Sequence, residues 1–159
     1  MITSKGIDIK IQSIYVDYIP TTTSVDALVP SEVIALSYLS QRDYFVFRCT
    51  TNKLFPISRH YVLNRRVEED YLSTLPKKII NVVKKKGVPD FLCYDKDKDD
   101  WFFVEIKIVG TGLSKAQIEW LFYTREKLIL MYVIPKIGMG EHRRYTTHHT
   151  PVLTKHTLK

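Results

Sequence analysis

The chain has 159 residues and a formal net charge of +7 at pH 7, with 24 Lys or Arg against 17 Asp or Glu. This length predicts a single domain, residues 1–159, whose core is large enough to need no disulfide. An apolar content of 45% and a charged content of 26% are ordinary for a soluble globular protein. The excess of positive charge favours a polyanionic partner, nucleic acid before a membrane surface.

Two cysteines, Cys49 and Cys93, are present and no CxxC pair occurs. No apolar run reaches the length of a membrane span, and the first residues lack a secretory signal pattern. These features predict an intracellular protein in a reducing compartment, with both thiols facing the core and no membrane partner.

The first half of the chain predicts strands around one helix. Alternation in residues 7–19 slips in phase near Gln12 and Ser13, which predicts two strands or one bulged strand in an N-terminal β extension of about residues 1–24. A helix is expected over residues 29–40, where Pro30 and Ser31 mark its start. A strand over 44–49 and a turn over 50–53 lead to a returning strand over 54–58, and residues 61–63 are ambiguous.

Residues 65–86 have a helical pattern that Pro76 divides into two pieces. Ser73 or Thr74 is the expected N-cap of the second piece. Its predicted core face is made of Ile79, Ile80 and Val83. Gly87 is expected to end this helix as a C-cap and to release the chain into a strand.

The stretch from residue 87 to 108 predicts a β-hairpin, because two apolar runs flank a charged turn over residues 95–100. If the turn is centred on Asp97 and Lys98, the numbers of paired residues add up to 195. Asp90 then lies opposite Glu105, and directly opposed residues share a face with their Cβ atoms about 5 Å apart. Side chains alternate along a strand, so Lys107 is predicted on the same face.

Two carboxylates so close to each other repel and lose solvation unless something compensates. A hard divalent cation does so, and carboxylate oxygens suit Mg²⁺ or Mn²⁺. Such a metal polarises a phosphodiester and lowers the pKa of a bound water, and a lysine orients that water. The alternative is a structural Asp–Lys–Glu cluster on a solvated sheet face.

After the hairpin, Ser114 is the expected N-cap of a helix over residues 115–125, with Gln117 in its first turn. Ile118, Leu121 and Phe122 form its predicted apolar face, and Trp120 is assigned to packing. Gln117 either lies beside the end of the Glu105 strand or is a surface residue. The apolar run over 127–134 predicts a buried central strand, parallel to its neighbour through the helical crossover.

Residues 136–159 form a basic tail with four histidines, which lack zinc-ligand spacing and cysteine partners. The tail is expected to bind nucleic acid or a partner subunit.

The stretch from Gly87 to Trp120 resembles a known family. Pro89-Asp90, fourteen intervening residues and Glu105-Ile106-Lys107 resemble the PD-(D/E)XK nuclease signature. The wider pattern, with Gly87 before Pro89-Asp90 and a Leu-Ser-x-x-Gln-x-x-Trp run from residue 113 to 120, is similar to the virus-type replication-repair nuclease (VRR-NUC) domain.

The resemblance implies roles for individual residues. Asp90 and Glu105 bind Mg²⁺ or Mn²⁺, helped by the backbone carbonyl of Ile106, while Lys107 positions the attacking water and the helix glutamine, Gln117, supports the site. An acidic residue of the first core helix often completes the metal site in this family. Glu32 matches that position, and the alternative is that it only complements the helix dipole. Glu68 and Glu69 are rivals, though they lie on the wrong element.

The resemblance also implies a fold and partners. The expected fold is α/β, a mixed central sheet with the hairpin in its middle and helices on both faces, in a restriction-endonuclease-like core of order α-β-β-β-α-β. Similar stand-alone proteins form homodimers that cut branched or flapped DNA. If the protein is viral, it is expected to work inside an infected host cell.

The function predicted is metal-dependent endonucleolytic hydrolysis of DNA. The residues expected to bind nucleic acid are basic: Arg65, Arg66, Lys84, Lys85, Lys86, Lys115, Arg143 and Arg144. The main alternative is a basic nucleic-acid-binding protein with a vestigial nuclease site. A magnesium enzyme acting on nucleotides is disfavoured, because a small substrate needs no basic surface.

Overall fold

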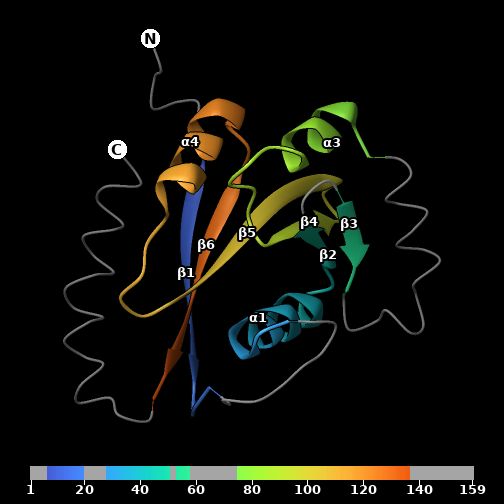
Figure 1. Cartoon of the computed structure of the whole chain (residues 1–159). Helices are drawn as coiled ribbons and strands as arrows, with labels where there is room; N and C mark the ends of the chain where they lie inside the picture. Colours follow the sequence, from blue (N-terminus) through green and yellow to red (C-terminus); the bar gives the residue numbers. More distant parts are fainter. Residues whose placement is uncertain (1–6, 20–27, 51–52, 58–74, 137–159) are drawn as a thin grey trace.

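The structure, a computed structural model, describes residues 7–19, 28–50, 53–57 and 75–136 (Figure 1). These ranges contain a single six-stranded mixed sheet and three helices. In chain order the elements are β1 (Ile9–Val16), α1 (Pro30–Gln41), β2 (Phe45–Thr50), β3 (Lys53–Pro56), α3 (Lys77–Val83), β4 (Phe91–Asp95), β5 (Asp100–Ile108), α4 (Lys115–Thr124) and β6 (Leu128–Pro135).

The strand order across the sheet is β1-β6-β5-β4-β2-β3. Strands β2, β3, β4 and β5 pair antiparallel, whereas β6 runs parallel to both β5 and β1. The β4–β5 hairpin therefore lies in the middle of the sheet, and the predicted α/β class with a mixed central sheet is confirmed. The predicted parallel crossover from β5 through α4 to β6 is confirmed as well.

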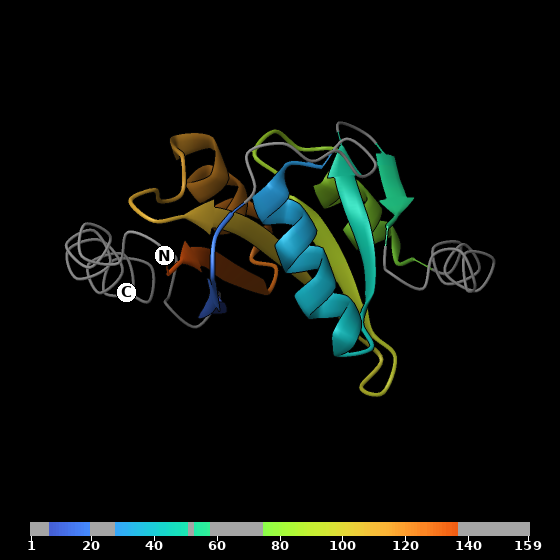
Figure 2. The same ribbon diagram turned by 90° about the horizontal axis from the view of Figure 1, so that it is seen from below.

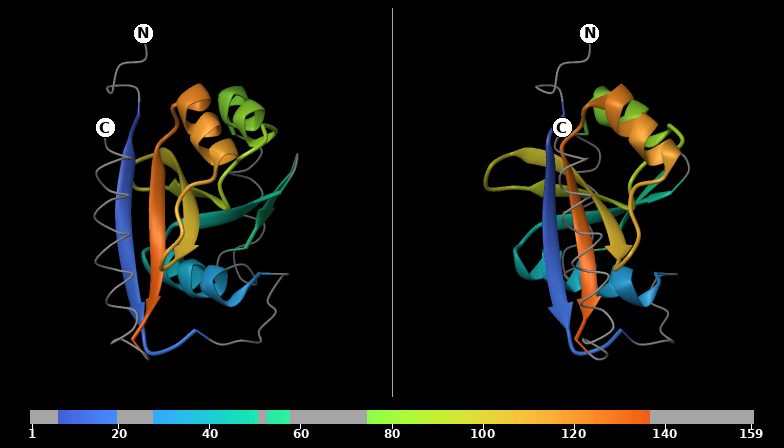
Figure 3. Two further views of the ribbon diagram at one scale, coloured as in Figure 1. Left: turned by 60° about the vertical axis from the view of Figure 1, so that its left-hand side comes forward. Right: turned by 90° about the vertical axis from the view of Figure 1, so that its left-hand side faces the viewer.

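Helices cover both faces of the sheet, as expected, and each face has its own apolar layer. On one face α1 packs through Ala35, Leu36 and Leu39, and Figure 2 shows this helix lying across the strands. On the other face lie α3 and α4, which are neighbours in both views of Figure 3.

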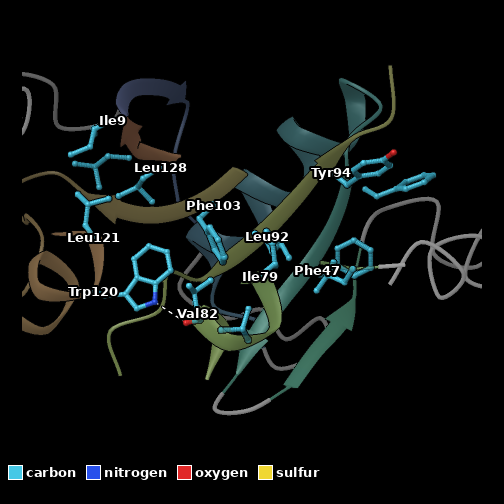
Figure 4. Close-up of a cluster of buried hydrophobic side chains, with 14 of the residues drawn as sticks. Ile9, Phe47, Ile79, Val82, Leu92, Tyr94, Phe103, Trp120, Leu121 and Leu128 are labelled. Atoms are coloured by element: carbon cyan, nitrogen blue, oxygen red, sulfur yellow. Dashed lines mark hydrogen bonds between the residues drawn. The ribbon is translucent and has the colours of Figure 1, made fainter. Parts of the chain in front are cut away.

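Trp120 ties the α3–α4 layer together (Figure 4). Its indole Nε1 donates a hydrogen bond of 2.9 Å to the carbonyl oxygen of Val82. Its ring meets that of Phe103 edge-on, at a centroid distance of 4.9 Å. A buried indole N–H needs such a partner, so the expectation that Trp120 serves packing is confirmed.

The register predicted for the hairpin is confirmed. Phe91 pairs with Val104 and Asp95 pairs with Asp100, so the paired numbers add up to 195 along the whole ladder. The four-residue turn between them is held by the Asp95 carboxylate, which accepts hydrogen bonds from two backbone N–H groups of the turn.

Strand β1 is one unbroken strand, paired along its whole length with β6. The expectation of two strands or a bulge is therefore wrong. The phase slip has another cause: Ile9 and Ile11 pack into the α3–α4 layer, whereas Ile14 and Val16 pack into the α1 layer. The apolar parity changes because a different helix layer covers each half of the strand.

The helix before the hairpin is shorter than predicted. It has Pro76 as its N-cap, with no capping side chain, and it ends at Val83 rather than Lys86. Ser73 and Thr74 lie outside the described residues. Ile79 and Val83 are buried as expected, but Ile80 is exposed and Val82 takes its place in the core.

Helix α4 begins as predicted, because the Ser114 hydroxyl accepts a hydrogen bond from the Gln117 backbone N–H. The predicted apolar face is only partly correct: Leu121 is buried beside Trp120, but Ile118 and Phe122 are exposed. The helix ends at Thr124, and Arg125 follows in the left-handed conformation. Strand β6 is buried along nearly its whole length, as expected.

Several predictions fall outside the described residues. They concern residues 61–63, the first helical piece over 65–74 with Arg65, Arg66, Glu68 and Glu69, and the tail from residue 137 with Arg143 and Arg144. In the described part of the chain, no helix is long and apolar enough to cross a membrane.

Candidate active site

Asp90 and Glu105 meet where the hairpin opens. The Asp90 carboxylate Oδ2 accepts a 2.9 Å hydrogen bond from the Ile106 backbone N–H, and Glu105 Oε1 accepts one of 3.2 Å from the Asp90 N–H. Each carboxylate is thus anchored to the backbone of the opposite strand. Glu105 is buried and Asp90 partly buried, so the two acidic groups predicted to converge do converge.

Lys107 and Gln117 complete a closed network around Glu105. The Lys107 Nζ lies 3.1 Å from Glu105 Oε2 and donates to Gln117 Oε1 over the same distance. Gln117 Nε2 donates to Glu105 Oε2 at 2.6 Å, and its Oε1 also accepts from the Ser114 N–H at 2.9 Å. All four predicted catalytic residues, Asp90 included, therefore lie together on the α3–α4 face. Gln117 is not a free surface residue.

Gly87 allows β4 and α4 to come close enough for this network. It has a φ of +89°, and a Cβ at this position would collide with the carbonyl oxygen of Ala116 in the first turn of α4. The loop that carries Asp90 thus packs directly on the turn that carries Gln117. The predicted C-cap is wrong in detail, since Lys84 caps the helix, and the glycine is required by this contact.

The electrostatics at Asp90 differ from those of an ordinary surface carboxylate. Burial, followed by the charge of the neighbouring Glu105 carboxylate, raises the pKa of Asp90 to about 7, against the opposing effects of the Ile106 N–H and Lys107. Asp90 and Glu105 are near enough for a proton to be shared between them. When both carboxylates are ionised, the pair carries more negative charge than Lys107 alone compensates.

The side-chain oxygens at the open end of the hairpin suit a hard divalent cation. Asp90 and Glu105 supply oxygen ligands, and the excess negative charge is what a cation would relieve. The Ile106 N–H points toward Asp90, and because the N–H and C=O of a strand residue share one side, its carbonyl faces the same edge.

The described ranges contain no group of three or more His, Cys, Asp or Glu side chains that could hold a metal. Mg²⁺ needs only one or two carboxylates, because it keeps several waters and takes substrate phosphate oxygens. The residues present therefore fit this ion.

Glu32 lies close enough to Asp90 to feel its charge. Burial raises the pKa of Glu32, and Asp90 raises it further, whereas the Val29 N–H and Arg48 lower it. Its Oε1 accepts a 3.0 Å hydrogen bond from the Val29 N–H and so closes the first turn of α1. Glu32 has the capping role of a first-turn acid, and a contribution to the metal site stays a prediction.

Cys49 lies beside the site, whereas the sequence predicted only that its thiol faces the core. Its backbone N–H donates 2.8 Å to the Asp90 carbonyl. Burial raises the pKa of its thiol, with further increases from the Asp90 and Glu105 charges. Only the antiparallel pairing of β2 with β4 brings it here, and no local pattern signals that pairing. Cys93 is buried in the α1 layer, as expected.

Some of the predicted basic residues flank the site. Lys84, Lys86 and Lys115 are exposed, on segments joined by the contact of Gly87 with Ala116. Lys85 is half-buried, and its Nζ lies 4.3 Å from the centroid of the Tyr123 ring. Arg65, Arg66, Arg143 and Arg144 lie outside the described residues.

Comparisons of the chain with models of known families, with curated proteins and with solved structures found no match.

Proposed function

We propose that this chain is a metal-dependent endonuclease that hydrolyses phosphodiester bonds in DNA, with Mg²⁺ or Mn²⁺ held by Asp90 and Glu105. The observation that carries the proposal is the network of Asp90, Glu105, Lys107 and Gln117 at one end of a central hairpin. A structural cluster would place one cation against one carboxylate, but here two partly or fully buried carboxylates face a single lysine.

Each side chain has a distinct role. A bound metal would polarise the phosphodiester and supply a reactive water. An ammonium has three donors, and Glu105 and Gln117 take two of those of Lys107. The third is left to orient a water or a phosphate oxygen. Gln117 holds both Glu105 and Lys107, which preserves their geometry when substrate arrives.

The arrangement of elements supports the same reading. Leaving out β3 and α3, the order from α1 is α1-β2-β4-β5-α4-β6, which corresponds to the α-β-β-β-α-β core of restriction-endonuclease-like folds. The net charge of +7 and the exposed Lys84, Lys86 and Lys115 near the site favour a polyanionic substrate. A homodimer that cuts branched or flapped DNA belongs to the proposal through the family resemblance.

Cleavage of labelled DNA by purified protein tests the proposal. Single-stranded, duplex, branched and flapped substrates, and an RNA, are incubated with Mg²⁺, Mn²⁺ or EDTA. We expect cleavage of at least one DNA that requires metal. Glu105→Gln should lower the rate at least ~10³-fold, because metal catalysis supplies several kcal/mol and each ~1.4 kcal/mol is tenfold in rate.

Glu119→Gln is the matched control, since Glu119 is an exposed glutamate of α4. It should cleave like the wild type, and the loss of activity in Glu105→Gln purified in the same way excludes a contaminating nuclease as the source of activity. A wild type that binds DNA but cleaves no substrate with either metal would instead support the vestigial, binding-only alternative. Cleavage of RNA alone would refute the assignment to DNA.

A further inference from the structure

Positive charge gathers on the α3–α4 layer. Residues 75–87 and 113–126, which contain these two helices, hold seven Lys or Arg against two Glu, a net charge of +5. Residues 28–44, which contain α1 on the opposite face, hold one Arg against one Asp and one Glu, a net charge of −1. A polyanion is therefore drawn to the face on which Lys107 and Gln117 lie, and not to the α1 face.

Two contacts lay the lysine segment 84–86 alongside α4, which is next to α3 in both views of Figure 3. At one end Gly87 packs on Ala116, and at the other the Lys85 Nζ lies 4.3 Å from the centroid of the Tyr123 ring. Ala116 and Tyr123 are seven residues apart, so they share one side of the helix and lie about 10 Å apart along its axis. The lysines therefore border a short path from the Tyr123 ring to the open end of the hairpin.

Helix α4 exposes aromatic surface beside this path. Tyr123 is 72% exposed, the highest value among the large apolar side chains in the part of the chain that the structure describes. Phe122 and Ile118 on the same helix are exposed as well. Single exposed apolar residues are ordinary on a protein surface, whereas neighbouring ones mark a binding surface. The ammonium of Lys85 lies against the Tyr123 ring, yet most of the residue remains open to a ligand.

The charge decides between two occupants of this surface. A second copy of the chain in a two-fold symmetric contact would set the same layer of +5 against itself, and like charges across an interface repel. A nucleic-acid strand brings phosphates to the lysines and base faces to the aromatic rings, a combination typical of single-strand binding. The bases of a duplex are already stacked on one another, so a duplex gains little from an exposed ring.

We propose that Tyr123, with Lys85 against its ring, stacks an unpaired base of a nucleic-acid strand that crosses the α3–α4 layer toward Asp90 and Glu105. The path of about 10 Å corresponds to about three nucleotides at ~3.4 Å each. The substrate class is then a strand with unpaired bases, such as the single-stranded arm of a flap. The inference rests on the proposed function for the destination of the strand, but its test requires no cleavage, so the two can fail separately.

Binding of a fluorescent single-stranded DNA, and of a duplex of equal length, is measured by anisotropy in EDTA. One stacked base is worth about fivefold to a hundredfold in affinity. Tyr123→Ala should therefore weaken single-strand binding at least ~5-fold and change duplex binding less than ~2-fold. Its salt dependence should stay that of the wild type, because no phosphate contact is lost. Tyr123→Phe should bind like the wild type, since the ring faces remain.

Tyr18→Ala is the matched control, because Tyr18 is 61% exposed and follows the end of β1, outside the α3–α4 layer. It should bind both DNAs like the wild type. The double variant Lys84→Gln with Lys86→Gln should instead weaken single-strand and duplex binding alike and reduce the salt dependence of both, because it removes phosphate contacts and no ring. Wild-type binding by this lysine variant would refute the basic path.

Three results would overturn the assignment of the base to Tyr123: equal losses for single strand and duplex in Tyr123→Ala, an equal loss in Tyr18→Ala, or wild-type binding by Tyr123→Ala. Sedimentation and thermal unfolding of the DNA-free protein identify the role that the ring would then have. A dimer that Tyr123→Ala dissociates, with single-strand binding unchanged, would assign the ring to a second copy of the chain. A loss of thermal stability with unchanged binding would assign it to packing.

Cleavage assays separate this inference from the proposed function. Metal-dependent cleavage by the wild type, with no effect of Tyr123→Ala on binding, would leave the nuclease standing and refute the subsite. Binding that depends on Tyr123, without cleavage of any substrate, would support the subsite and refute the nuclease.

Discussion

The two ends of the β4–β5 hairpin place acidic residues opposite each other in the same register, but in opposite environments. At the turn, Asp95 lies across from Asp100. Asp95 accepts hydrogen bonds from the turn backbone, and Asp100 pairs with Lys127 at 2.6 Å in an exposed ion pair. At the open end, Asp90 and Glu105 are covered by the first turn of α4 and share one lysine.

The difference shows that register alone neither buries an acidic pair nor shifts its pKa. Water and local backbone groups solvate the turn carboxylates, so each has its own partners. Burial removes that solvation from Asp90 and Glu105, and together with the charge of Glu105 it raises the pKa of Asp90 to about 7. The helix that follows the hairpin thus buries one acidic pair beside Lys107 and leaves the other exposed.

Replacing the lysine at each end of the hairpin by alanine should give the largest difference in cleavage rate. Lys107→Ala removes the ammonium that Glu105 and Gln117 hold, and we expect the cleavage rate to fall at least ~10³-fold. Lys127→Ala removes the partner of Asp100 at the turn and should change the rate less than ~2-fold, because surface pairs contribute little. Single-turnover kinetics with saturating enzyme measure both. Equal rates for the two variants would mean that the open end is not the active site.

Substitutions at positions of positive φ should also affect the free energy of unfolding more at the open end of the hairpin than at its turn. Gly87→Ala places a Cβ at a positive φ and against Ala116, and we expect a loss of about 3 kcal/mol or more in the free energy of unfolding. At the turn, Asp99 also has a positive φ of 49° and accepts a hydrogen bond from the Tyr94 hydroxyl. Asp99→Gly relieves strain but loses that bond, so it should stay within about 1 kcal/mol of the wild type. Urea unfolding gives both values.

The pH dependence of stability should depend on the open end. The folded-state pKa of Asp90 is raised to about 7 from its ordinary value of 3.8. Between those values the folded protein keeps a proton that the unfolded chain has lost, so this group makes stability fall as pH rises from about 4 to 7. Asp90→Asn should flatten this part of the profile, whereas Asp97→Asn in the exposed turn should not. An identical slope in Asp90→Asn and the wild type would contradict the raised pKa.

Mg²⁺ should stabilise the folded protein when Asp90 is ionised. At a concentration tenfold above its dissociation constant, a ligand adds about 1.4 kcal/mol to the free energy of unfolding. We expect this gain at pH 8, a smaller one at pH 5, and none in Glu105→Gln at either pH. Chemical unfolding with and without Mg²⁺ measures it. A gain that persists in Glu105→Gln would place the metal elsewhere.

The turn should yield the smallest effect. Asp100→Asn breaks the exposed pair with Lys127, and surface pairs contribute about 0–1 kcal/mol. We expect a loss of stability below about 1 kcal/mol that disappears in 1 M salt, because salt screens exposed charges. A larger or salt-independent loss would show that the two ends differ less than their burial indicates.

The sequence by itself was enough to predict the hairpin and the residues that converge at its open end. A turn centred on Asp97 and Lys98 determines every pair in the ladder, and the alternation of side chains places Asp90, Glu105 and Lys107 on one face. Ser114 is likewise a local signal, because a cap depends only on the backbone of the next three residues. These predictions succeed because they depend on neighbours in the chain.

Only the tertiary structure decided which surfaces are covered. The strand around Ile9 pairs with β6, more than a hundred residues away, and its phase slip follows from two helix layers rather than a bulge. Ile80, Ile118 and Phe122 have helical spacing for a core, yet they are exposed, because α3 and α4 bury narrower stripes than the pattern indicates. Burial depends on what packs against an element, and packing is set by contacts between segments distant in the chain.

The candidate site also has features that the sequence predicts and features that only the tertiary structure shows. Its charged residues could be read from the sequence, but the contact of Gly87 with Ala116, the approach of Cys49 to Asp90 and the use of Glu32 as a cap in α1 could not. Each of these depends on where a strand or helix lies beside the hairpin. Local periodicity fixes which side chains share a face, whereas only the assembled sheet and helices determine which of them lose water and acquire a shifted pKa.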